Sequence, residues 1–139
     1  MRYLLDTNHW SYLQEKRPAV VARVRELPDE DELLMSVVSQ AELLAGVQLV
    51  RSDKRRAELA ALYRHAIAAA TEVIPITSPV AEEFASILAE LRDKGRPIET
   101  NDIWIAATAR SQGLIVATSD PDFQHVDGLQ LEDWTQAKS

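Results

Sequence analysis

Short apolar runs alternate along the chain with longer segments in which apolar residues recur at helical spacing. The apolar runs at residues 3–5, 33–38, 73–76 and 114–117 predict buried strands, and a weaker run at 129–131 predicts a last strand. Pro75 lies within the third run, which indicates an edge strand, because proline has no backbone N–H to donate to a sheet ladder.

Helices are predicted in the intervals between these runs. The clearest begins at Ser78-Pro79 and ends at Gly95, and its apolar stripe consists of Val80, Phe84, Ile87, Leu88 and Leu91. Further helices are predicted over 7–16, 18–27, 39–49, 53–70 and 101–112, with Asn101 as the cap of the last one and Gly113 as its end. Strands that alternate with helices predict the α/β class, with a mostly parallel central sheet in a three-layer α/β/α domain.

The composition agrees with a single domain that spans residues 1–139. The hydrophobic fraction of 46% and the charged fraction of 27% are typical of a soluble globular protein. No run approaches the roughly 18 apolar residues of a membrane span, and the first apolar run is too short for a signal peptide, so we expect a cytoplasmic location. The absence of cysteine leaves Asp, Glu and His as the available metal ligands.

The net charge of −7 argues against a broad, sequence-independent grip on nucleic acid, which requires a basic surface. Positive charge is nevertheless clustered within residues 51–56 and 92–96. Solvated helix ends are the simpler interpretation of both clusters. The alternative is phosphate contact, for which the candidate residues are Arg51, Lys54, Arg55 and Arg96.

Four acids stand at junctions between the predicted elements, and each has a local explanation. Asp6 ends a strand and could cap the next helix, and residues 39–42 fit a capping box in which Glu42 reaches back to Ser39. Asp102 would suit the dipole of a helix start, and Asp120 precedes a proline in a turn dipeptide.

Taken together, the same four acids predict a metal site. The carboxyl ends of parallel strands share one sheet edge, so side chains far apart in sequence would converge there. Convergent carboxylates repel one another, and a divalent cation such as Mg²⁺ or Mn²⁺ relieves that repulsion through oxygen ligands. A metal-bound water ionises more readily and becomes a nucleophile, which points to metal-dependent chemistry on a phosphate. Thr7, Asn8 and Thr118 lie near the acids and could orient them.

Four short motifs in this order resemble those of the PIN-domain nucleases, and among them the VapC-like toxins of toxin–antitoxin pairs. The motifs are Leu-Asp-Thr-Asn at 5–8, Ser-Gln-Ala-Glu-Leu at 39–43, Asn-Asp-Ile-Trp-Ile-Ala-Ala at 101–107 and Thr-Ser-Asp-Pro-Asp-Phe at 118–123. The resemblance covers about residues 2 to 134. A departure is the doublet His9-Trp10, where apolar residues are commoner in the family.

The resemblance implies a Mg²⁺- or Mn²⁺-dependent endoribonuclease that forms a homodimer and is blocked by a small VapB-like antitoxin. The family's catalytic and metal-binding acids correspond to Asp6, Glu42, Asp102 and Asp120. Asp122 is the reserve for the fourth acid, which is the least constant in the family. Thr118 matches a conserved hydroxyl, and the supporting residues are Thr7, Asn8, Thr118 and Asp122.

Other functional classes fit less well. A haloacid-dehalogenase-type phosphotransferase needs a second Asp two residues after the first, where this chain has Asn8, and the acidic pair and lysine of a receiver domain are not visible. The three histidines show no spacing that suggests a metal-free ribonuclease, and paired-carboxylate glycoside hydrolysis would not need four acids. A non-catalytic PIN-like module that binds RNA or protein, and a nuclease acting on DNA, remain the alternatives.

Overall fold

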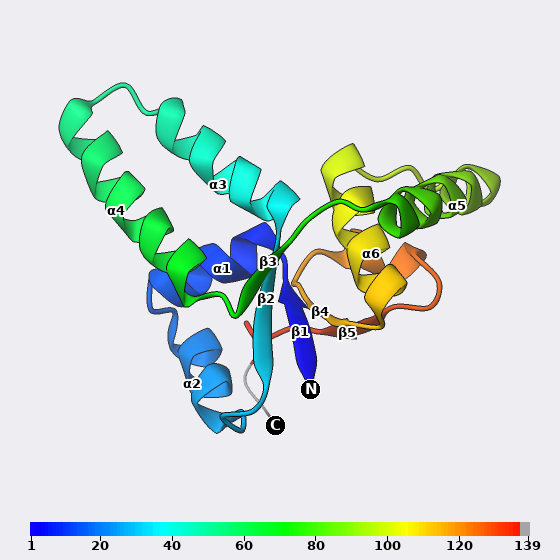
Figure 1. Ribbon diagram of the computed structural model, residues 1–139, viewed down its shortest axis with the longest axis horizontal. Coiled ribbons are helices and arrows are strands. Elements are labelled where there is room, and N and C mark those ends of the chain that lie inside the picture. Colours follow the sequence, from blue (N-terminus) through cyan, green and yellow to red (C-terminus); the bar gives the residue numbers. More distant parts are fainter. Residues whose placement is uncertain (137–139) are drawn as a thin grey trace.

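All five strands belong to one parallel sheet, as a computed structural model shows for residues 1–136 (Figure 1). The strand order is β3-β2-β1-β4-β5. The strands are β1 (Arg2–Leu5), β2 (Glu32–Ser36), β3 (Glu72–Ile74), β4 (Ile115–Ala117) and β5 (Gln130–Glu132). The predicted α/β class is confirmed, and β3 lies at a sheet edge as Pro75 indicated.

Six α-helices and one short 3-10 helix connect the strands. The α-helices are α1 (Thr7–Gln14), α2 (Pro18–Glu26), α3 (Val37–Gln48), α4 (Asp53–Ala69), α5 (Ser78–Lys94) and α6 (Thr100–Gln112). The 3-10 helix η1 (Pro121–His125) lies between β4 and β5. The helices over 18–27, 53–70 and 78–95 were predicted to within one residue at each end.

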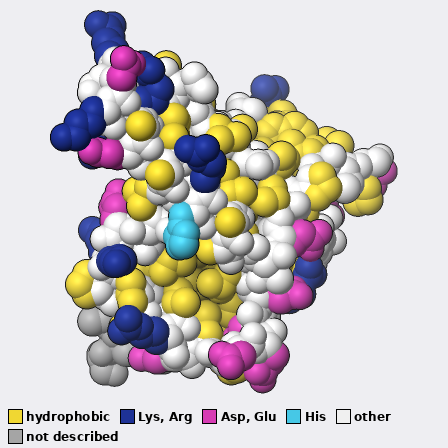
Figure 2. All heavy atoms as spheres, turned by 60° about the vertical axis from the view of Figure 1, so that its left-hand side comes forward, with side chains coloured by type: hydrophobic (Ala, Val, Ile, Leu, Met, Phe, Trp, Pro, Cys, Tyr) yellow, Lys and Arg dark blue, Asp and Glu magenta, His cyan; other side chains and the backbone are white. Residues whose placement is uncertain are grey.

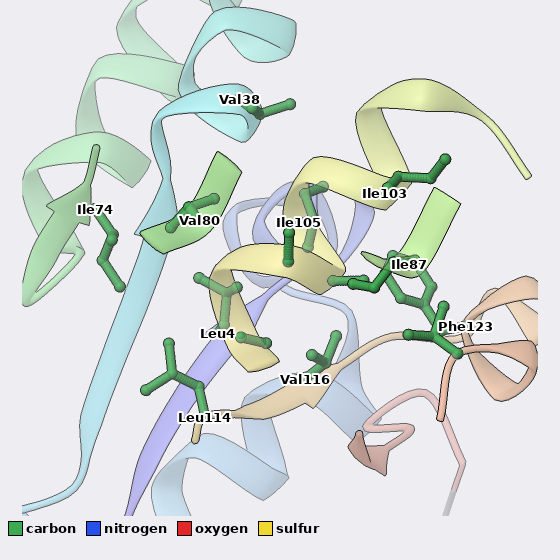
Figure 3. Packing of buried hydrophobic residues seen from close by; sticks show 14 of the residues in the cluster. Leu4, Val38, Ile74, Val80, Ile87, Ile103, Ile105, Leu114, Val116 and Phe123 are labelled. Carbon is green, nitrogen blue, oxygen red and sulfur yellow. The ribbon is translucent and has the colours of Figure 1, made fainter. Parts of the chain in front are cut away.

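Alternation along β1 divides the core into two layers. Leu4 faces the layer that contains α5 and α6, whereas Tyr3 and Leu5 face the layer that contains α1, α2 and α4. Figure 3 shows the first layer, where Leu4 and Val116 of the sheet pack against side chains of α5 and α6. Both faces of the sheet are therefore covered, which explains why its strands appear in the sequence as continuous apolar runs.

Two helix starts differ from their predicted positions. α3 begins at Val37, because Ser36 caps it by accepting the Val38 N–H at 3.1 Å, so the strand predicted to Val38 ends earlier. Ser39 consequently lies inside the helix, where its side chain is buried. α6 begins at Thr100, before Asn101, so the prediction of an Asn101 cap is wrong. Apolar periodicity located both helices, but it does not specify which polar residue caps them.

The segment after β5 folds back over the sheet, and its Trp134 is buried against the ring of Tyr3 with centroids 5.3 Å apart. Trp134 thus packs in the layer that contains α1 and α2. None of the helices within residues 1–136 combines the length and apolar character that a membrane-spanning helix needs.

A pair of glycine substitutions should separate backbone strain from helix propensity. Gly113 ends α6 with φ of 67°, a left-handed conformation in which a side chain is strained, so Gly113→Ala should lower the free energy of unfolding by about 1 kcal/mol. Gly46 lies within α3, where an added Cβ would make an ordinary 3.8 Å contact with Tyr63. Gly46→Ala should therefore raise the free energy of unfolding by roughly 0.5–1 kcal/mol. Urea unfolding measures both, and a shift of the same sign in the two variants would contradict the assignment.

Candidate active site

The order in which the chain adds strands to the sheet reverses between β1 and β4. From β1 the chain adds β2 and β3 on one side, and it then returns to add β4 and β5 on the other side. The two strands are joined at their carboxyl ends by the Asp6 N–H, which donates to the Ala117 carbonyl at 3.0 Å. Such a switch point leaves a crevice beyond the strand ends, where ligands of open α/β sheets collect.

Asp6 occupies this crevice with both carboxylate oxygens engaged. The residue is 6% exposed, and its side chain caps α1, with Oδ1 accepting the backbone N–H of His9 at 2.8 Å. Oδ2 accepts the hydroxyl of Thr118 at 2.6 Å, and that hydroxyl accepts the Asp120 N–H at 3.0 Å. The local explanation of Asp6 as a helix cap is correct, and the same contacts also orient its carboxylate.

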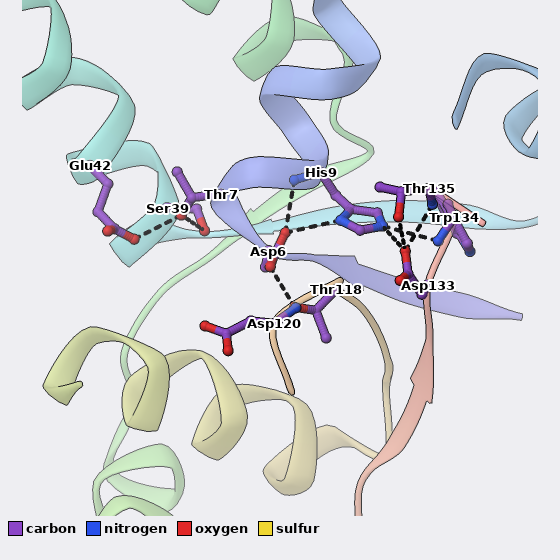
Figure 4. A network of polar contacts seen from close by, with 10 residues as sticks. All are labelled: Asp6, Thr7, His9, Ser39, Glu42, Thr118, Asp120, Asp133, Trp134 and Thr135. Atoms are coloured by element: carbon purple, nitrogen blue, oxygen red, sulfur yellow. Dashed lines mark hydrogen bonds and ion pairs between the residues drawn. The ribbon is translucent and has the colours of Figure 1, made fainter. Parts of the chain in front are cut away.

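Glu42 is oriented by a different hydroxyl. Thr7 donates to Glu42 Oε1 at 2.7 Å, and the Thr7 oxygen lies 2.9 Å from the Ser39 hydroxyl. Because Thr7 has one proton and gives it to the carboxylate, Ser39 must act as donor to Thr7. The capping-box hypothesis for Ser39 and Glu42 is therefore wrong: both lie inside α3, on the side that faces the crevice (Figure 4).

A polar cavity of about 210 Å³ gathers the predicted acids. Its lining consists of Asp6, Thr7, Asn8, Glu42, Glu99, Asp102, Asp120 and Asp122. Asp120 caps η1 by accepting the Asp122 N–H at 2.9 Å, so both candidates for the fourth acid face the same cavity. Thr118 contributes through Asp6 without being among the residues that line this cavity.

Sequence reasoning missed Glu99 in this cavity. Glu99 stands at the N-terminal boundary of α6, three residues before Asp102, so both reach the cavity from one helix end. The available signal was the spacing of three, which places two residues on the same side of a helix. The assumed start at Asn101 put Glu99 outside the helix and concealed it.

Crowding of acids changes the ionisation of Asp102. Burial, followed by the negative charges of Asp120 and Glu42, raises its pKa from 3.8 to about 7, and the charges of Glu99 and Asp6 act in the same direction. A carboxyl group that resists ionisation near neutral pH, inside a cavity of other carboxylates, lacks a compensating positive charge.

The residues present fit a divalent metal ion. Among residues 1–136, no Lys, Arg or His side chain lines the cavity, and its carboxylate oxygens are the ligands that Mg²⁺ and Mn²⁺ prefer. Within the same part of the chain, no three such side chains already lie close enough together to hold one ion between them. Binding would therefore require the carboxylates to turn toward one another, which their repulsion opposes until a cation is present.

The four basic candidates for RNA contact lie outside the acidic cavity. Arg51 precedes α4, Lys54 and Arg55 lie in its first turn, and Arg96 lies in the connection from α5 to α6. All four side chains belong to exposed residues. Figure 2 shows Lys and Arg side chains gathered at the end of the α3–α4 hairpin, at the top of that view. The hairpin carries Glu42 near its base, so a chain of phosphates could extend from the cavity toward its tip.

Replacing the carboxylate of Asp102 should stabilise the metal-free protein above neutral pH. Its pKa is raised on folding, so ionisation opposes folding: the cost is absent well below pH 3.8, grows as the pH rises and is complete above about 7. We expect Asp102→Asn to raise the free energy of unfolding at pH 8 by about 1–2 kcal/mol, a figure reduced for partial solvent screening. Urea unfolding at pH 5 and pH 8 measures this, and an equal gain at both would contradict the electrostatic origin.

Comparisons with known proteins agree with this geometry. The family model described as PIN domain matches residues 3–129. The chain is 34% identical to Ribonuclease VapC1 of Haemophilus influenzae strain R2866 over 98% of this chain and 100% of that protein. It is 32% identical to the tRNA(fMet)-specific endonuclease VapC of Shigella flexneri over 97% of this chain and 99% of that protein.

A solved structure extends the similarity to three dimensions. The structure of VapBC-1 from nontypeable Haemophilus influenzae superimposes with a TM-score of 0.84 at 30% sequence identity, covering 98% of this chain and 100% of that one. The family model covers most of the chain, and its matched region contains all four predicted acids. The resemblance in the sequence is thus confirmed, and this chain belongs to the PIN-domain family.

Proposed function

We propose that this protein is a metal-dependent endoribonuclease and the toxin of a toxin–antitoxin pair. The observation that carries the proposal is the cavity at the switch point between β1 and β4, where carboxylates gather without a lining cation among the described residues. Relatives similar over nearly the whole chain are named ribonucleases and a tRNA-specific endonuclease, which supports RNA as the substrate.

Mg²⁺ or Mn²⁺ is the proposed cofactor, and its ligands are drawn from Asp6, Glu42, Asp102 and Asp120. When bound, the ion supplies an ionised water and a positive charge for the developing negative charge on the phosphate. Thr118 and the backbone of α1 hold the Asp6 carboxylate in place, and Thr7 does the same for Glu42. The surroundings of Asp102 raise its pKa in the metal-free protein, so Asp102 would have to lose its proton to act as a metal ligand.

The partners follow from the same comparison. Several similar solved structures are VapBC complexes, so we propose a VapB-like antitoxin as the inhibitor of this chain. The homodimer that the family resemblance implies is the proposed oligomeric state. A basic side chain from the antitoxin tail would suit the acidic cavity, because it would replace the charge of the metal. An antitoxin without any basic residue near the cavity in the complex would contradict this mode of inhibition.

Cleavage should require both the metal ion and the ionisable carboxylates. The purified protein, free of antitoxin, is incubated with a mixed single-stranded RNA pool in Mn²⁺ or in EDTA. We expect cleavage in Mn²⁺ and none in EDTA. Asp102→Asn should lower the cleavage rate by at least about 100-fold, because removing one ligand weakens both metal binding and activation of the water. Because water is the nucleophile, the products should carry 5′-phosphate and 3′-hydroxyl ends.

The matched control for this experiment is Asp29→Asn. Asp29 is exposed in the loop between α2 and β2, at the opposite ends of the strands from the cavity, so full activity is expected. Products with 2′,3′-cyclic phosphate would contradict the mechanism, since they show that the ribose hydroxyl attacked. No cleavage under any condition would favour the non-catalytic module. Cleavage of a DNA pool incubated in parallel, without cleavage of the RNA, would favour a nuclease acting on DNA.

The basic residues at the tip of the α3–α4 hairpin should contribute to RNA binding by pairing with phosphates. In an Asp102→Asn background, which prevents cleavage, Lys54→Ala with Arg55→Ala should weaken binding and reduce the salt dependence by about 0.7 in log–log slope for each phosphate no longer neutralised. Fluorescence anisotropy at several salt concentrations measures this. Lys16→Ala with Arg25→Ala, an equal charge change at exposed positions after α1 and within α2, is the control and should leave the slope unchanged.

A further inference from the structure

The imidazole of His9 lies between Asp6 and the chain segment that follows β5 (Figure 4). It is fully buried, with 0% of its surface exposed. Its Nε2 accepts the backbone N–H of Trp134 at 3.1 Å, and its Nδ1 lies 3.3 Å from Asp6 Oδ1. A buried histidine therefore connects a predicted metal-binding carboxylate to a distant part of the main chain.

The contact with Trp134 specifies where the proton of His9 resides. A nitrogen that accepts an N–H must present its lone pair, so Nε2 is unprotonated and the proton of the neutral ring is on Nδ1. A doubly protonated ring would place an N–H of its own against that of Trp134. Asp133, whose Oδ1 is 3.9 Å from Nε2, is too distant to hold a hydrogen bond to it. The Nδ1–H consequently faces Asp6.

This Nδ1–H is incompletely satisfied. Among residues 1–136, only Nδ1 of His9 and Nε1 of Trp10 are buried side-chain nitrogen or oxygen atoms without an aligned hydrogen-bond partner. Leaving a buried donor unpaired costs about 1–3 kcal/mol, which favours any small rotation that aligns it. An acceptor within reach of such a rotation is Asp6 Oδ1, which already accepts the His9 backbone N–H at 2.8 Å.

We propose that His9 is a positioning residue for Asp6, acting through its Nδ1–H and held in that tautomer by the main chain at Trp134. With the His9 backbone and Thr118, the ring would provide a third donor to the Asp6 carboxylate. The carboxylate is thereby held in one orientation, and its one remaining lone pair is directed into the cavity, where a metal ion needs it. The catalytic consequence rests on the proposed metal-dependent function, whereas the tautomer and the contact with Asp6 do not.

Two substitutions separate the two nitrogens of the ring. His9→Asn places an amide N–H near the position of Nδ1 and leaves the Trp134 N–H without its acceptor. His9→Gln places an amide oxygen near Nε2, which retains that acceptor, and lacks the donor to Asp6. His65→Gln, at an exposed position on α4, is the matched control.

The expected results differ for metal binding and for stability. By calorimetric titration of the full chain with Mn²⁺, His9→Gln should lose about 10-fold or more in affinity, the size of effect typical for partners of metal ligands, and His9→Asn should lose much less. In thermal unfolding, His9→Gln should keep the higher melting temperature of the two variants, because only His9→Gln keeps the contact with Trp134. If the variant that loses more stability also loses more Mn²⁺ affinity, His9 acts through packing alone, and the proposal is overturned.

A measurement on the unaltered protein is independent of how the variants fold. Long-range ¹H–¹⁵N correlation spectra of the metal-free chain distinguish the two neutral tautomers of a histidine from its doubly protonated form. We expect the Nδ1–H tautomer for His9, and finding the Nε2–H or the doubly protonated form would overturn the proposal. If the spectra and the Mn²⁺ titrations agree with expectation and no RNA is cleaved, then the nuclease function fails while the role of His9 stands.

Discussion

The parallel pairing of β1 with β4 is the constraint on which the rest of the structure depends. It joins the first strand to one that follows it by more than a hundred residues, and the hydrogen bond from Asp6 to Ala117 closes the pairing at its carboxyl end. The sheet grows from β1 toward β2 and β3 on one side and from β4 toward β5 on the other. The connections therefore diverge at this pair and leave a crevice beyond its carboxyl ends. The position of the acidic cavity follows from this topology.

The carboxylates in the cavity are held by neutral donors. Hydroxyls of Thr118 and Thr7 and a backbone N–H of α1 contact Asp6 and Glu42, and each leaves the negative charge in place. A hydrogen bond to a charged group contributes about 1.5–3 kcal/mol, so these contacts offset part of the repulsion without removing it. Burial and the remaining repulsion both raise the pKa of Asp102, and the repulsion is the part that a divalent cation would relieve.

The core permits this concentration of charge because both faces of the sheet are covered. Leu4 and Val116 on one face, and Leu5 and Trp10 on the other, are fully buried within layers of helices. Each buried Leu or Val contributes roughly 1.5–3 kcal/mol through removal of apolar surface from water. The apolar burial on both faces thus offsets the unfavourable electrostatic energy of the carboxylates.

The sequence by itself determined the α/β class, nearly every helix and strand, and the convergence of four acids on one cavity. It could do so because apolar periodicity and junction positions are local properties of the chain. It did not locate Glu99 in the cavity or exclude the capping box of Ser39 and Glu42, since helix starts depend on which polar groups find partners in space. The hydrogen bonds that connect Ser39 through Thr7 to Glu42, and Trp134 to His9, join residues separated by as many as 125 positions. Only the tertiary structure decided them, because hydrogen bonds between distant segments depend on strand order and helix packing, which no local pattern encodes.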